Sequence, residues 1–345
     1  MRVGVVPAPG SGLRTMEATG QLGRLTRHFT AYLNAGHALT YFSGLPNDPD
    51  WIAEMIRPAT GPHAMNGTRR ALLRPLREPR AWRRCDVLRA TSLAGALSCI
   101  TARVAFGVPF VVSLGAKYEE IARLHGRPAW KWSALRRFAV RLAAAVIVPN
   151  PVHARETQAR FPRARIVHVP NWVDTQMFRP GPRPGGRPTV LYVGRLVVEK
   201  NLKRLAMVCR EHGWRLICVG EGPGRDDLTA LGEECPGAVP WEDLPAWHAK
   251  AHVFCLPSFT EGHPKALLEA MASGLPCAVS TGVTGFQTAT LATFPPASSD
   301  AMGEAIHAMM TGDSWVRPRV REYALAYDIT RVLPQEIRVV EEAAR

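Results

Sequence analysis

Short apolar runs rich in β-branched residues alternate with helical patterns along the chain, and this alternation constrains the fold more than any other feature. Continuous apolar strands separated by helices form parallel sheets that are covered by helices on both faces. The first half contains six predicted strands, at Val3–Pro7, Ala38–Ser43, Asp86–Leu88, Phe110–Leu114, Val146–Pro149 and Ile166–Val169. The second half contains four, at Val190–Val193, Leu216–Val219, Val253–Leu256 and Cys277–Ser280.

The most linker-like segment is "RPGPRPGGRP", Arg179 to Pro188, and it predicts a domain boundary. The chain of 345 residues is long enough for two domains with full cores. We therefore predict an α/β protein of two tandem doubly wound, Rossmann-like domains, residues 1–183 and 184–329. A C-terminal helix at about 330–345 is expected to pack back on the first domain. Ligands of such folds bind at the carboxyl ends of the strands.

Cysteine usage and hydropathy exclude several classes of protein. The seven cysteines form no CxxC pair and mostly lie in apolar runs, which indicates reduced thiols and neither a disulfide framework nor a zinc site. The apolar run at the N-terminus is too short to form the apolar core of a signal peptide. The longest apolar run, Phe138 to Val148, is interrupted by Arg141 and is much shorter than the roughly 20 residues of a membrane span. These features predict a cytoplasmic protein.

The charge is concentrated in the first half. Residues 1–170 contain 25 Lys and Arg against 9 Asp and Glu, whereas residues 171–345 contain 18 against 20. A one-sided basic field predicts an anionic partner such as a lipid surface, a nucleic acid or an acidic polymer, or else a solvated basic face. Eight arginines lie between Arg69 and Arg89, where Pro75 and Pro79 prevent one long amphipathic helix.

A cluster of tryptophan and basic residues favours a membrane over a nucleic acid. Trp130-Lys131-Trp132 is followed by Arg136, Arg137 and Arg141, a composition that suits the interface of a bilayer. A core helix with a solvated basic face fits the same residues. Since the chain has no recognised nucleic-acid motif, nucleic-acid binding is not predicted. We therefore also predict that the protein binds peripherally at the inner face of the cell membrane.

In the second half, each strand is followed by glycine-rich or polar residues. Gly194-Arg195 follows the first strand, and Lys200 stands just before the next helix. The turn "GEGPG", Gly220 to Gly224, follows the second strand. An arginine at a strand end and a lysine at a helix N-terminus can approach a diphosphate from two sides, with the helix dipole adding to the attraction.

Two glutamates lie eight residues apart around the third strand's loop and the following helix. Pro264 suits the first turn of a helix that runs to about Ser273. Glu261 then lies on the loop before the helix, and Glu269 is a lone acid within an otherwise apolar helix. Carboxylates are strong acceptors for paired sugar hydroxyls, so we expect both to contact a hydroxylated ligand.

Four segments, "VPNWVDTQMFRP", "VLYVGRLVVEKN", "VGEGPG" and "PSFTEGHPKALLEAMASGLPCAVS", together resemble family 4 glycosyltransferases, which are retaining enzymes of the GT-B fold. The match is specific over about residues 168–280 and looser elsewhere. The resemblance implies that Arg195 and Lys200 hold the donor diphosphate. It further implies that Glu261 contacts the transferred hexose and that Glu269 contacts the ribose hydroxyls.

The resemblance also implies a larger donor-binding set. The "GEGPG" turn and the segment around Val239 would border the base, and the loop Pro7 to Arg14 would close over the phosphates. The predicted donor-binding residues are Gly10, Gly12, Gly194, Gly220, Glu221, Gly222, Val239, Gly262, His263, Pro264 and Glu269.

Two departures from the family pattern are visible. Many members place a histidine after the strand that reads "PFVVSLGAKY" here, and this chain has Leu114-Gly115 instead. The stretch after Ser280 also lacks the usual acidic residue. A catalytically degenerate member that binds an anionic surface is therefore one alternative, and a nucleotide-sugar 2-epimerase is another.

The predicted function is transfer of a hexosyl unit from a UDP- or GDP-linked sugar to a hydroxyl of a glycan or lipid-linked acceptor, with catalytic roles for Arg195, Lys200 and Glu261. No cofactor and no metal is expected, because preorganised cations can stabilise the leaving diphosphate. Asp48-Pro49-Asp50 is similar to the DxD motif of metal-dependent glycosyltransferases, but it lies in a turn-rich loop with no adjoining strand. The base, the sugar and the acceptor stay open.

Overall fold

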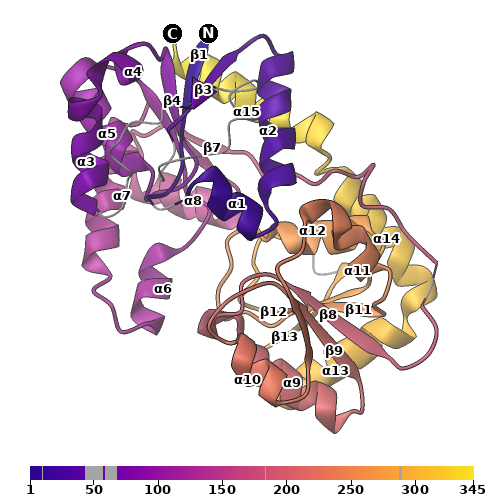
Figure 1. Cartoon of the computed structure of the whole chain (residues 1–345). Coiled ribbons are helices and arrows are strands. Elements are labelled where there is room, and N and C mark those ends of the chain that lie inside the picture. The colour runs from indigo at the N-terminus through magenta and orange to yellow at the C-terminus, as the bar shows by residue number, and fades with distance from the viewer. Residues whose placement is uncertain (10, 43–56, 59–67, 183, 287–289) are drawn as a thin grey trace. The chain divides into compact units, whose positions relative to one another are not determined.

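The computed structural model describes residues 1–9, 11–42, 57–58, 68–182, 184–286 and 290–345 (Figure 1). Two compact units make up the chain. Unit 1 comprises Met1–Pro170 together with Leu333–Arg345, and unit 2 comprises Asn171–Val332. Each unit is built around one parallel β-sheet, as the alternating sequence pattern predicts.

The sheet of unit 1 has seven strands among the described residues, in the order β3-β2-β1-β4-β5-β6-β7, and every pair is parallel. The order reverses between β1 and β4, so the loops after these two strands lie together: the amide of Thr91 donates to Val6 O over 3.0 Å. The strands are β1 Arg2–Val6, β2 Ala38–Tyr41, β3 Arg57–Pro58, β4 Val87–Ala90, β5 Phe110–Ser113, β6 Ala145–Val148 and β7 Ile166–His168.

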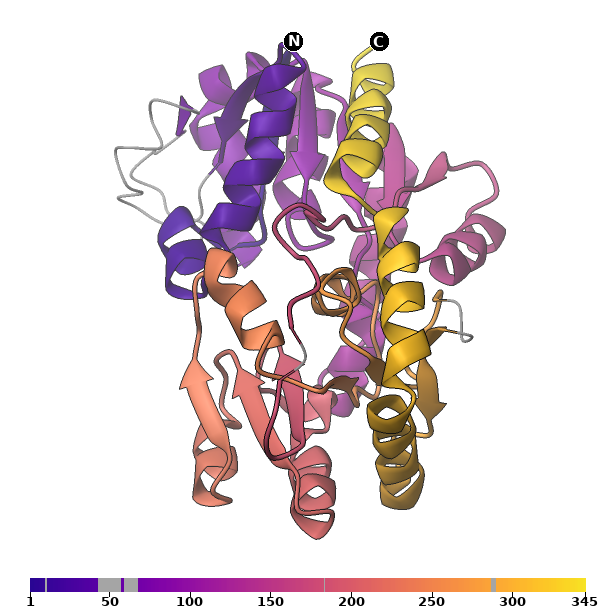
Figure 2. The same cartoon turned by 90° about the vertical axis from the view of Figure 1, so that its right-hand side faces the viewer.

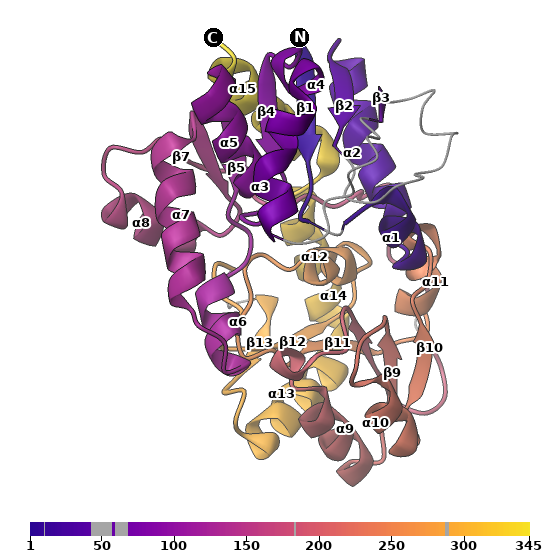
Figure 3. The same cartoon turned by 60° about the vertical axis from the view of Figure 1, so that its left-hand side comes forward.

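Helices connect the strands of unit 1 along the chain, as in other doubly wound folds. Figure 3 shows α6 next to the start of α7, with α8 beside α7. The helices are α1 Leu13–Ala18, α2 Leu22–Asn34, α3 Thr68–Arg77, α4 Pro79–Arg83, α5 Ala96–Phe106, α6 Tyr118–Leu124, α7 Trp130–Leu142 and α8 Pro151–Arg160. The arginine-rich segment thus forms two short helices and a strand, with Pro75 inside α3 and Pro79 at the start of α4.

The apolar residues between about Thr15 and Asn34 recur at helical spacing and predict a single helix, and the structure divides this segment into α1 and α2. Gly20 between them has a φ of 67°, in the left-handed region that a helix cannot contain. The amide of Gln21 donates back to Met16 O over 2.7 Å and closes the first helix. The apolar face of α2 packs into the core, since Phe29 and Tyr32 are buried.

In the described part of unit 2, the sheet has six strands in the order β10-β9-β8-β11-β12-β13, again all parallel. The strands are β8 Thr189–Val193, β9 Arg215–Val219, β10 Glu234–Gly237, β11 Val253–Leu256, β12 Cys277–Ser280 and β13 Ala292–Phe294. The edge strands β10 and β13 are absent from the sequence prediction. For β10 the reason is its composition, "ECPG", which contains no apolar run and pairs with a register shift.

The helices of unit 2 lie between and beyond these strands. They are the 3-10 helices η2 Val198–Lys200 and η3 Trp241–Asp243, and the α-helices α9 Leu202–Glu211, α10 Arg225–Ala230, α11 Leu244–His248, α12 Lys265–Ala272, α13 Ser299–Thr311 and α14 Asp313–Leu325. The helix after Pro264 ends as predicted, with Gly274 at a φ of 65° directly beyond it.

The units divide between Pro170 and Asn171, earlier than the predicted junction near residue 184. The reason is the packing of the segment that precedes the proline-rich stretch. Trp172 and Phe178 are buried and contact the Trp241 ring of unit 2, at centroid distances of 6.1 Å and 5.8 Å. A Pro- and Gly-rich composition marks a surface segment, whereas the buried aromatics decide to which unit the chain belongs.

The C-terminal helix α15, Ile329–Ala343, belongs to unit 1 from Leu333 on (Figure 2). A buried polar network joins it to the sheet. Glu336 Oε1 accepts from Arg89 Nε over 2.9 Å and from Tyr32 Oη over 3.0 Å. Arg89 Nη2 also donates to Ser113 Oγ over 2.7 Å. These bonds connect β4, β5, α2 and α15 at one point.

No helix in the described part of the chain is long and apolar enough to span a bilayer.

Candidate functional site

The strand order of unit 2 reverses between β8 and β11, and the predicted catalytic residues lie at the carboxyl ends of these two strands. Arg195 and Lys200 follow β8, and Glu261 follows β11. In open α/β sheets such a reversal leaves a crevice outside the carboxyl ends of the strands, and ligands bind there. The topology therefore brings together three residues that the sequence separates by up to 66 positions.

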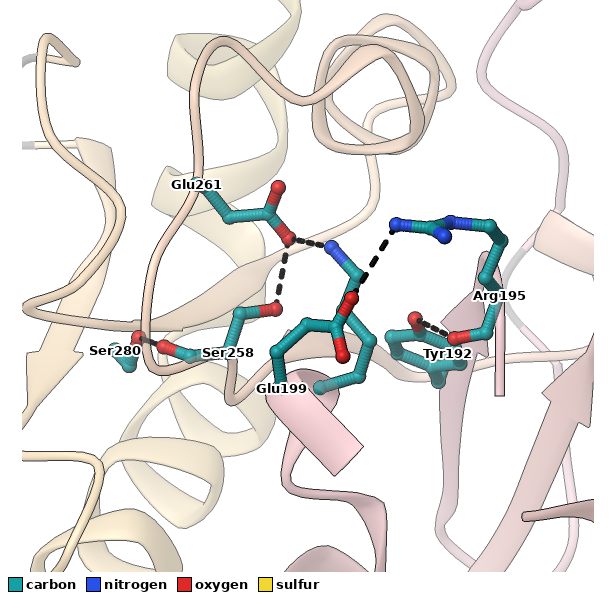
Figure 4. Close-up of polar contacts among 7 residues, drawn as sticks. Tyr192, Arg195, Glu199, Ser258, Glu261 and Ser280 are labelled. Carbon is teal, nitrogen blue, oxygen red and sulfur yellow. Dashed lines mark hydrogen bonds and ion pairs between the residues drawn. The ribbon is translucent and has the colours of Figure 1, made fainter. Parts of the chain in front are cut away.

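Lys200 and Glu261 form an ion pair at this edge (Figure 4). The Lys200 ammonium donates to Glu261 Oε1, and the side chains are only 13% and 11% exposed. Ser258 Oγ donates to the same carboxylate oxygen over 2.7 Å. Ser280 Oγ, at the end of β12, donates to the carbonyl of Ser258 and so holds this loop against the next strand. Lys200 and Ser258 thus hold the Glu261 carboxylate from two sides.

Arg195 presents its guanidinium to solvent, with 69% of the side chain exposed. Its Nη2 contacts Glu199 Oε1 at 3.3 Å, and Glu199 is itself buried at 3% exposure. The backbone carbonyl of Arg195 accepts from Tyr192 Oη over 2.9 Å. Burial raises the pKa of Tyr192 well above 10, and nearby Glu261 raises it further, so the phenol stays a neutral donor. The backbone at Arg195 is fixed while its charged end stays accessible to a ligand.

Gly194 and Gly220 permit a close contact between the loops that follow β8 and β9. Gly220 has a φ of 138°, and a Cβ at this position would lie 2.0 Å from the carbonyl oxygen of Gly194. The amide of Gly194 donates to Val219 O over 2.9 Å. Only glycine fits such a contact, so the "GEGPG" turn follows from the backbone packing as well as from any ligand.

Glu221 and the segment around Val239 are neighbours in the structure. Glu221 Oε1 accepts from Arg225 Nη1 over 2.8 Å and from the amide of Ala238 over 3.3 Å. Gly222 continues the turn, where the amide of Gly224 donates to Leu196 O over 2.9 Å. The two segments predicted to border the base therefore lie side by side at the ends of β9 and β10. Their contact with a base stays a prediction.

His263 is buried between a backbone segment and aromatic rings. Its Nδ1 accepts from the amide of Asn171 over 3.3 Å, and its ring stacks on Phe286 at a centroid distance of 4.7 Å. Gly262 is buried beside it, and Pro264 caps the N-terminus of α12. In this arrangement His263 anchors the loop that carries Glu261.

Glu269 is 1% exposed on the inner face of α12. Its Oε1 accepts from Trp241 Nε1 over 2.8 Å. The sequence predicts a carboxylate with a function on an apolar helix, and the structure gives that carboxylate a partner from η3. Its contact with ribose hydroxyls stays a prediction.

The predicted phosphate loop lies in unit 1. Gly12 is buried and precedes α1, and the amide of Met16 donates to its carbonyl over 3.1 Å. Gly10, and the aspartates Asp48 and Asp50, lie outside the described residues. Within the described ranges, no three His, Cys, Asp or Glu side chains are close enough together to hold a metal ion. The role of Gly12 at the donor phosphates stays a prediction.

Sequence reasoning missed Ser258, Glu199 and Trp241. Ser258 follows β11 in the same way that Arg195 follows β8, so its place after a strand was an available signal. Glu199 is adjacent to Lys200 in the sequence, and in the structure its carboxylate pairs with Arg195. Nothing in the sequence pairs Trp241 with Glu269, since the contact depends on how η3 packs against α12.

The site combines cations, a positioned carboxylate and hydroxyl groups at one sheet edge. Arg195 and Lys200 supply positive charge of the kind that stabilises a phosphate oxyanion. Glu261 supplies a strong acceptor for hydroxyl groups, held by Ser258. This is the chemistry that binding of a sugar joined to a diphosphate requires.

Comparison with known proteins gives the family. A family model described as "Glycosyltransferase Family 4" matches residues 22–177, and one described as "Glycosyl transferases group 1" matches residues 187–312. A GDP-mannose-dependent alpha-(1-6)-phosphatidylinositol monomannoside mannosyltransferase of Mycobacterium tuberculosis is 33% identical over 174 residues, which are 42% of this chain and 45% of that protein. The chain spans about half the length of the curated relatives it matches.

Solved structures with the same fold superpose on nearly the whole chain. Sucrose-phosphate synthase from Thermosynechococcus elongatus superposes with a TM-score of 0.83 at 18% identity, over 99% of this chain and 98% of that one. HepE of Anabaena in complex with UDP-glucose superposes with a TM-score of 0.76 at 14% identity, over 99% of each chain. Both share the fold of this chain. With one family model on each half and this fold, the chain belongs to the group 1, family 4 glycosyltransferases of the GT-B fold.

Proposed function

We propose that this protein transfers a hexosyl unit from a nucleoside diphosphate sugar to a hydroxyl of a glycan or lipid-linked acceptor, with retention of configuration and without a metal ion. GDP-mannose is the first donor to test, since it is the donor named for the Mycobacterium tuberculosis relative. The observation that carries the proposal is the position of Arg195, Lys200 and Glu261 at the strand reversal of unit 2.

The difficult step in this reaction is departure of the nucleoside diphosphate, because negative charge develops on its phosphate. Lys200 and Arg195 would stabilise that charge from the end of β8, and removal of one such preorganised donor typically costs a factor of about 100 to 1,000 in turnover. Glu261 would accept hydrogen bonds from the sugar. The ammonium of Lys200 has three N–H donors, so it can hold Glu261 and a phosphate oxygen together.

An assay with purified protein tests the proposal. Arg195→Ala and Lys200→Ala should each lower turnover on GDP-mannose by at least about a hundredfold, because each removes a charge from the leaving-group site. Near-parental turnover in both variants contradicts the assignment. Lys203→Ala is a matched control, since Lys203 is 69% exposed on α9 and pairs with Asp227.

The same assay separates the alternatives. Proton NMR of the product identifies its anomeric configuration, and an epimerised nucleotide sugar without any transfer identifies the 2-epimerase. Turnover should persist in excess EDTA. Loss of turnover in EDTA that manganese or magnesium restores would instead implicate Asp48 and Asp50. Binding of GDP without either reaction identifies the degenerate member.

We further propose that α7 contacts an anionic membrane surface. Trp130 and Phe138 are 68% and 58% exposed, and Arg137 and Arg141 are exposed on the same side of the helix. Trp132 and Arg136 point inward: Trp132 stacks on Tyr118 at 4.5 Å, and Arg136 pairs with Glu119 at 2.8 Å. The predicted cluster is therefore divided between a surface stripe and the interior.

Co-sedimentation tests this contact with phosphatidylcholine vesicles that do or do not contain phosphatidylglycerol. Basic residues near an anionic bilayer contribute about 1 kcal/mol each, and added salt screens this attraction. Binding should therefore rise with phosphatidylglycerol and fall with salt, and Trp130→Ser should weaken it. Equal binding to both kinds of vesicle, or none to either, contradicts the proposal.

A further inference from the structure

Two cysteines of unit 2 lie next to each other on neighbouring strands, Cys218 on β9 and Cys235 on the edge strand β10. The strands are parallel, and residues 217–219 of β9 lie beside residues 234–237 of β10, so that β10 has one residue more over this stretch. Residues at the same register of adjacent strands point to the same face of the sheet. The two thiols accordingly share a hydrogen bond.

The two thiols differ in their environment. Cys235 is half-buried, whereas Cys218 is buried. The hydrogen bond with Cys218 lowers the pKa of Cys235 to about 7, and Thr229 and Arg225 lower it as well, whereas burial and Glu233 act in the opposite direction. The same hydrogen bond and burial raise the pKa of Cys218 well above its usual range. Since the thiolate is the nucleophilic form of cysteine, Cys235 is the reactive member of the pair.

The other five cysteines of the chain are buried, and burial raises the pKa of each thiol. They are Cys85, Cys99, Cys209, Cys255 and Cys277. Redox-responsive cysteines have a low pKa and access to solvent, and they often lie beside a second cysteine that completes a disulfide. Among the described residues, Cys235 with Cys218 is the pair that meets these conditions.

We propose that Cys235 and Cys218 form a thiol–disulfide exchange site for low-molecular-weight disulfides such as glutathione disulfide. The Cys235 thiolate attacks one sulfur of the disulfide, whose S–S bond breaks, and the other half leaves as a thiolate that takes up a proton. Cys218 then gives its proton to solvent and attacks the Cys235 sulfur, which expels the second small thiol. Two protein thiols are thereby oxidised by two electrons, and the small disulfide is reduced to two thiols.

The pair lies directly before the two segments that are predicted to border the nucleotide base. The amide of Gly220 donates to Gly237 O over 2.8 Å, and the amide of Ala238 donates to Glu221 Oε1 over 3.3 Å. A disulfide joins its sulfurs at about 2.05 Å, much closer than a hydrogen bond does, so its formation should draw the strands together and displace these turns. Oxidation should therefore weaken nucleotide binding, an expectation that rests on the proposed function for the identity of the ligand.

Mass spectrometry of the whole protein and of its peptides, after incubation with glutathione disulfide, tests the site. The parent protein should lose two hydrogen atoms and yield linked peptides that contain Cys218 and Cys235, and dithiothreitol should reverse the change. Cys218→Ser or Cys218→Ala should stop at a mixed disulfide of Cys235 with glutathione. Cys235→Ser should slow the loss of thiols by about a hundredfold or more, because it removes the attacking thiolate.

The matched control is Cys209→Ser, which replaces a buried cysteine of α9 and should leave the linked peptides unchanged. Cys235 is half-buried, so its serine variant should fold. A parent protein that stays reduced overturns the proposal. A disulfide between other cysteines, or equal oxidation of the parent and Cys235→Ser, overturns it as well.

Isothermal titration calorimetry with GDP tests the consequence for the donor site. The oxidised parent should bind GDP about tenfold more weakly than the reduced parent. Cys235→Ser treated with the same disulfide should bind GDP as tightly as the reduced parent. A Cys218–Cys235 disulfide that leaves GDP affinity unchanged overturns the coupling to the donor site. Absence of GDP binding by the reduced parent counts against the proposed function, whereas the linked peptides would still establish the exchange site.

Discussion

Each unit contains a cation and a carboxylate that are paired with little exposure to solvent, and the two pairs differ in what surrounds them. In unit 1, Arg89 donates from Nε to Glu336, from Nη1 to Ala90 O and from Nη2 to Ser113. Glu336 Oε1 also accepts a hydrogen bond from Tyr32 Oη and lies 3.2 Å from His28 Nε2. This pair is enclosed by four structural elements.

In unit 2, Lys200 and Glu261 lie on loops at the carboxyl edge of the sheet, and Ser258 is the second group on the carboxylate. A pair that is enclosed on all sides holds helices and strands together, whereas a pair at a sheet edge can exchange a partner for a ligand. We therefore expect the environment of an ion pair, more than its chemistry, to separate a structural role from a functional one.

The largest expected effect is on turnover, at the unit 2 pair. Glu261→Gln keeps the shape of the side chain and removes its charge, so transfer should fall by about a thousandfold while the protein stays folded. Steady-state kinetics with GDP-mannose and thermal unfolding measure the two effects. A variant that loses stability but keeps turnover per folded molecule would give this pair the structural role instead.

The opposite result is expected at the unit 1 pair. Glu336→Gln leaves Arg89 buried without its counterion, which should lower the free energy of unfolding by about 3 kcal/mol, while turnover of the folded fraction is unchanged. Urea unfolding measures the effect. Glu342→Gln is the control, because this residue is 40% exposed on the same helix and its pair with Arg165 is a surface pair. If the two variants lose equal stability, burial is not the deciding factor.

Acid should weaken the unit 1 pair in a defined pH range. Burial raises the pKa of Glu336, but Arg89 and His28 lower it more, so that it lies well below 4.5 in the folded protein. A carboxyl with a depressed pKa contributes its full stability above its unfolded pKa and loses it as the pH falls towards its folded pKa. The stability difference between the parent and Glu336→Gln should thus be constant above about pH 5 and shrink below it. A difference that stays constant down to pH 3 would contradict this account.

The smallest effect concerns the cysteines, which are free in the described residues and, apart from Cys235, buried. A hydrogen bond with Cys218 lowers the pKa of Cys235 to about 7, although burial opposes the shift. Alkylation by iodoacetamide should accordingly be fastest at Cys235 and half-maximal near pH 7, as peptide mass spectrometry over a pH series would show. Cys235→Ser should abolish this reaction. Equal labelling of Cys255, which is buried in β11, would contradict it.

Much of the site follows from sequence because it obeys the rule that ligand residues follow parallel strands. Arg195, Lys200 and Glu261 all lie in the segments that follow the apolar runs of β8 and β11, so their common edge could be predicted once the sheet was predicted. Glu269 stood out as one acid in an apolar helix. Edge strands such as β10 could not be found in this way, because pairing with β9 compensates for their poor composition.

The sequence by itself determined that the chain forms two parallel α/β units, because continuous apolar strands that alternate with helices form parallel sheets covered on both faces, and it determined which loops carry the predicted site residues. Only the tertiary structure decided the partners. Lys200 and Glu261 are 61 residues apart and Arg89 and Glu336 are 247 apart, and their pairing depends on strand order and on where α15 packs. The division at Asn171 was likewise decided by the burial of Trp172 and Phe178, because contacts between distant residues leave no local signal in the chain.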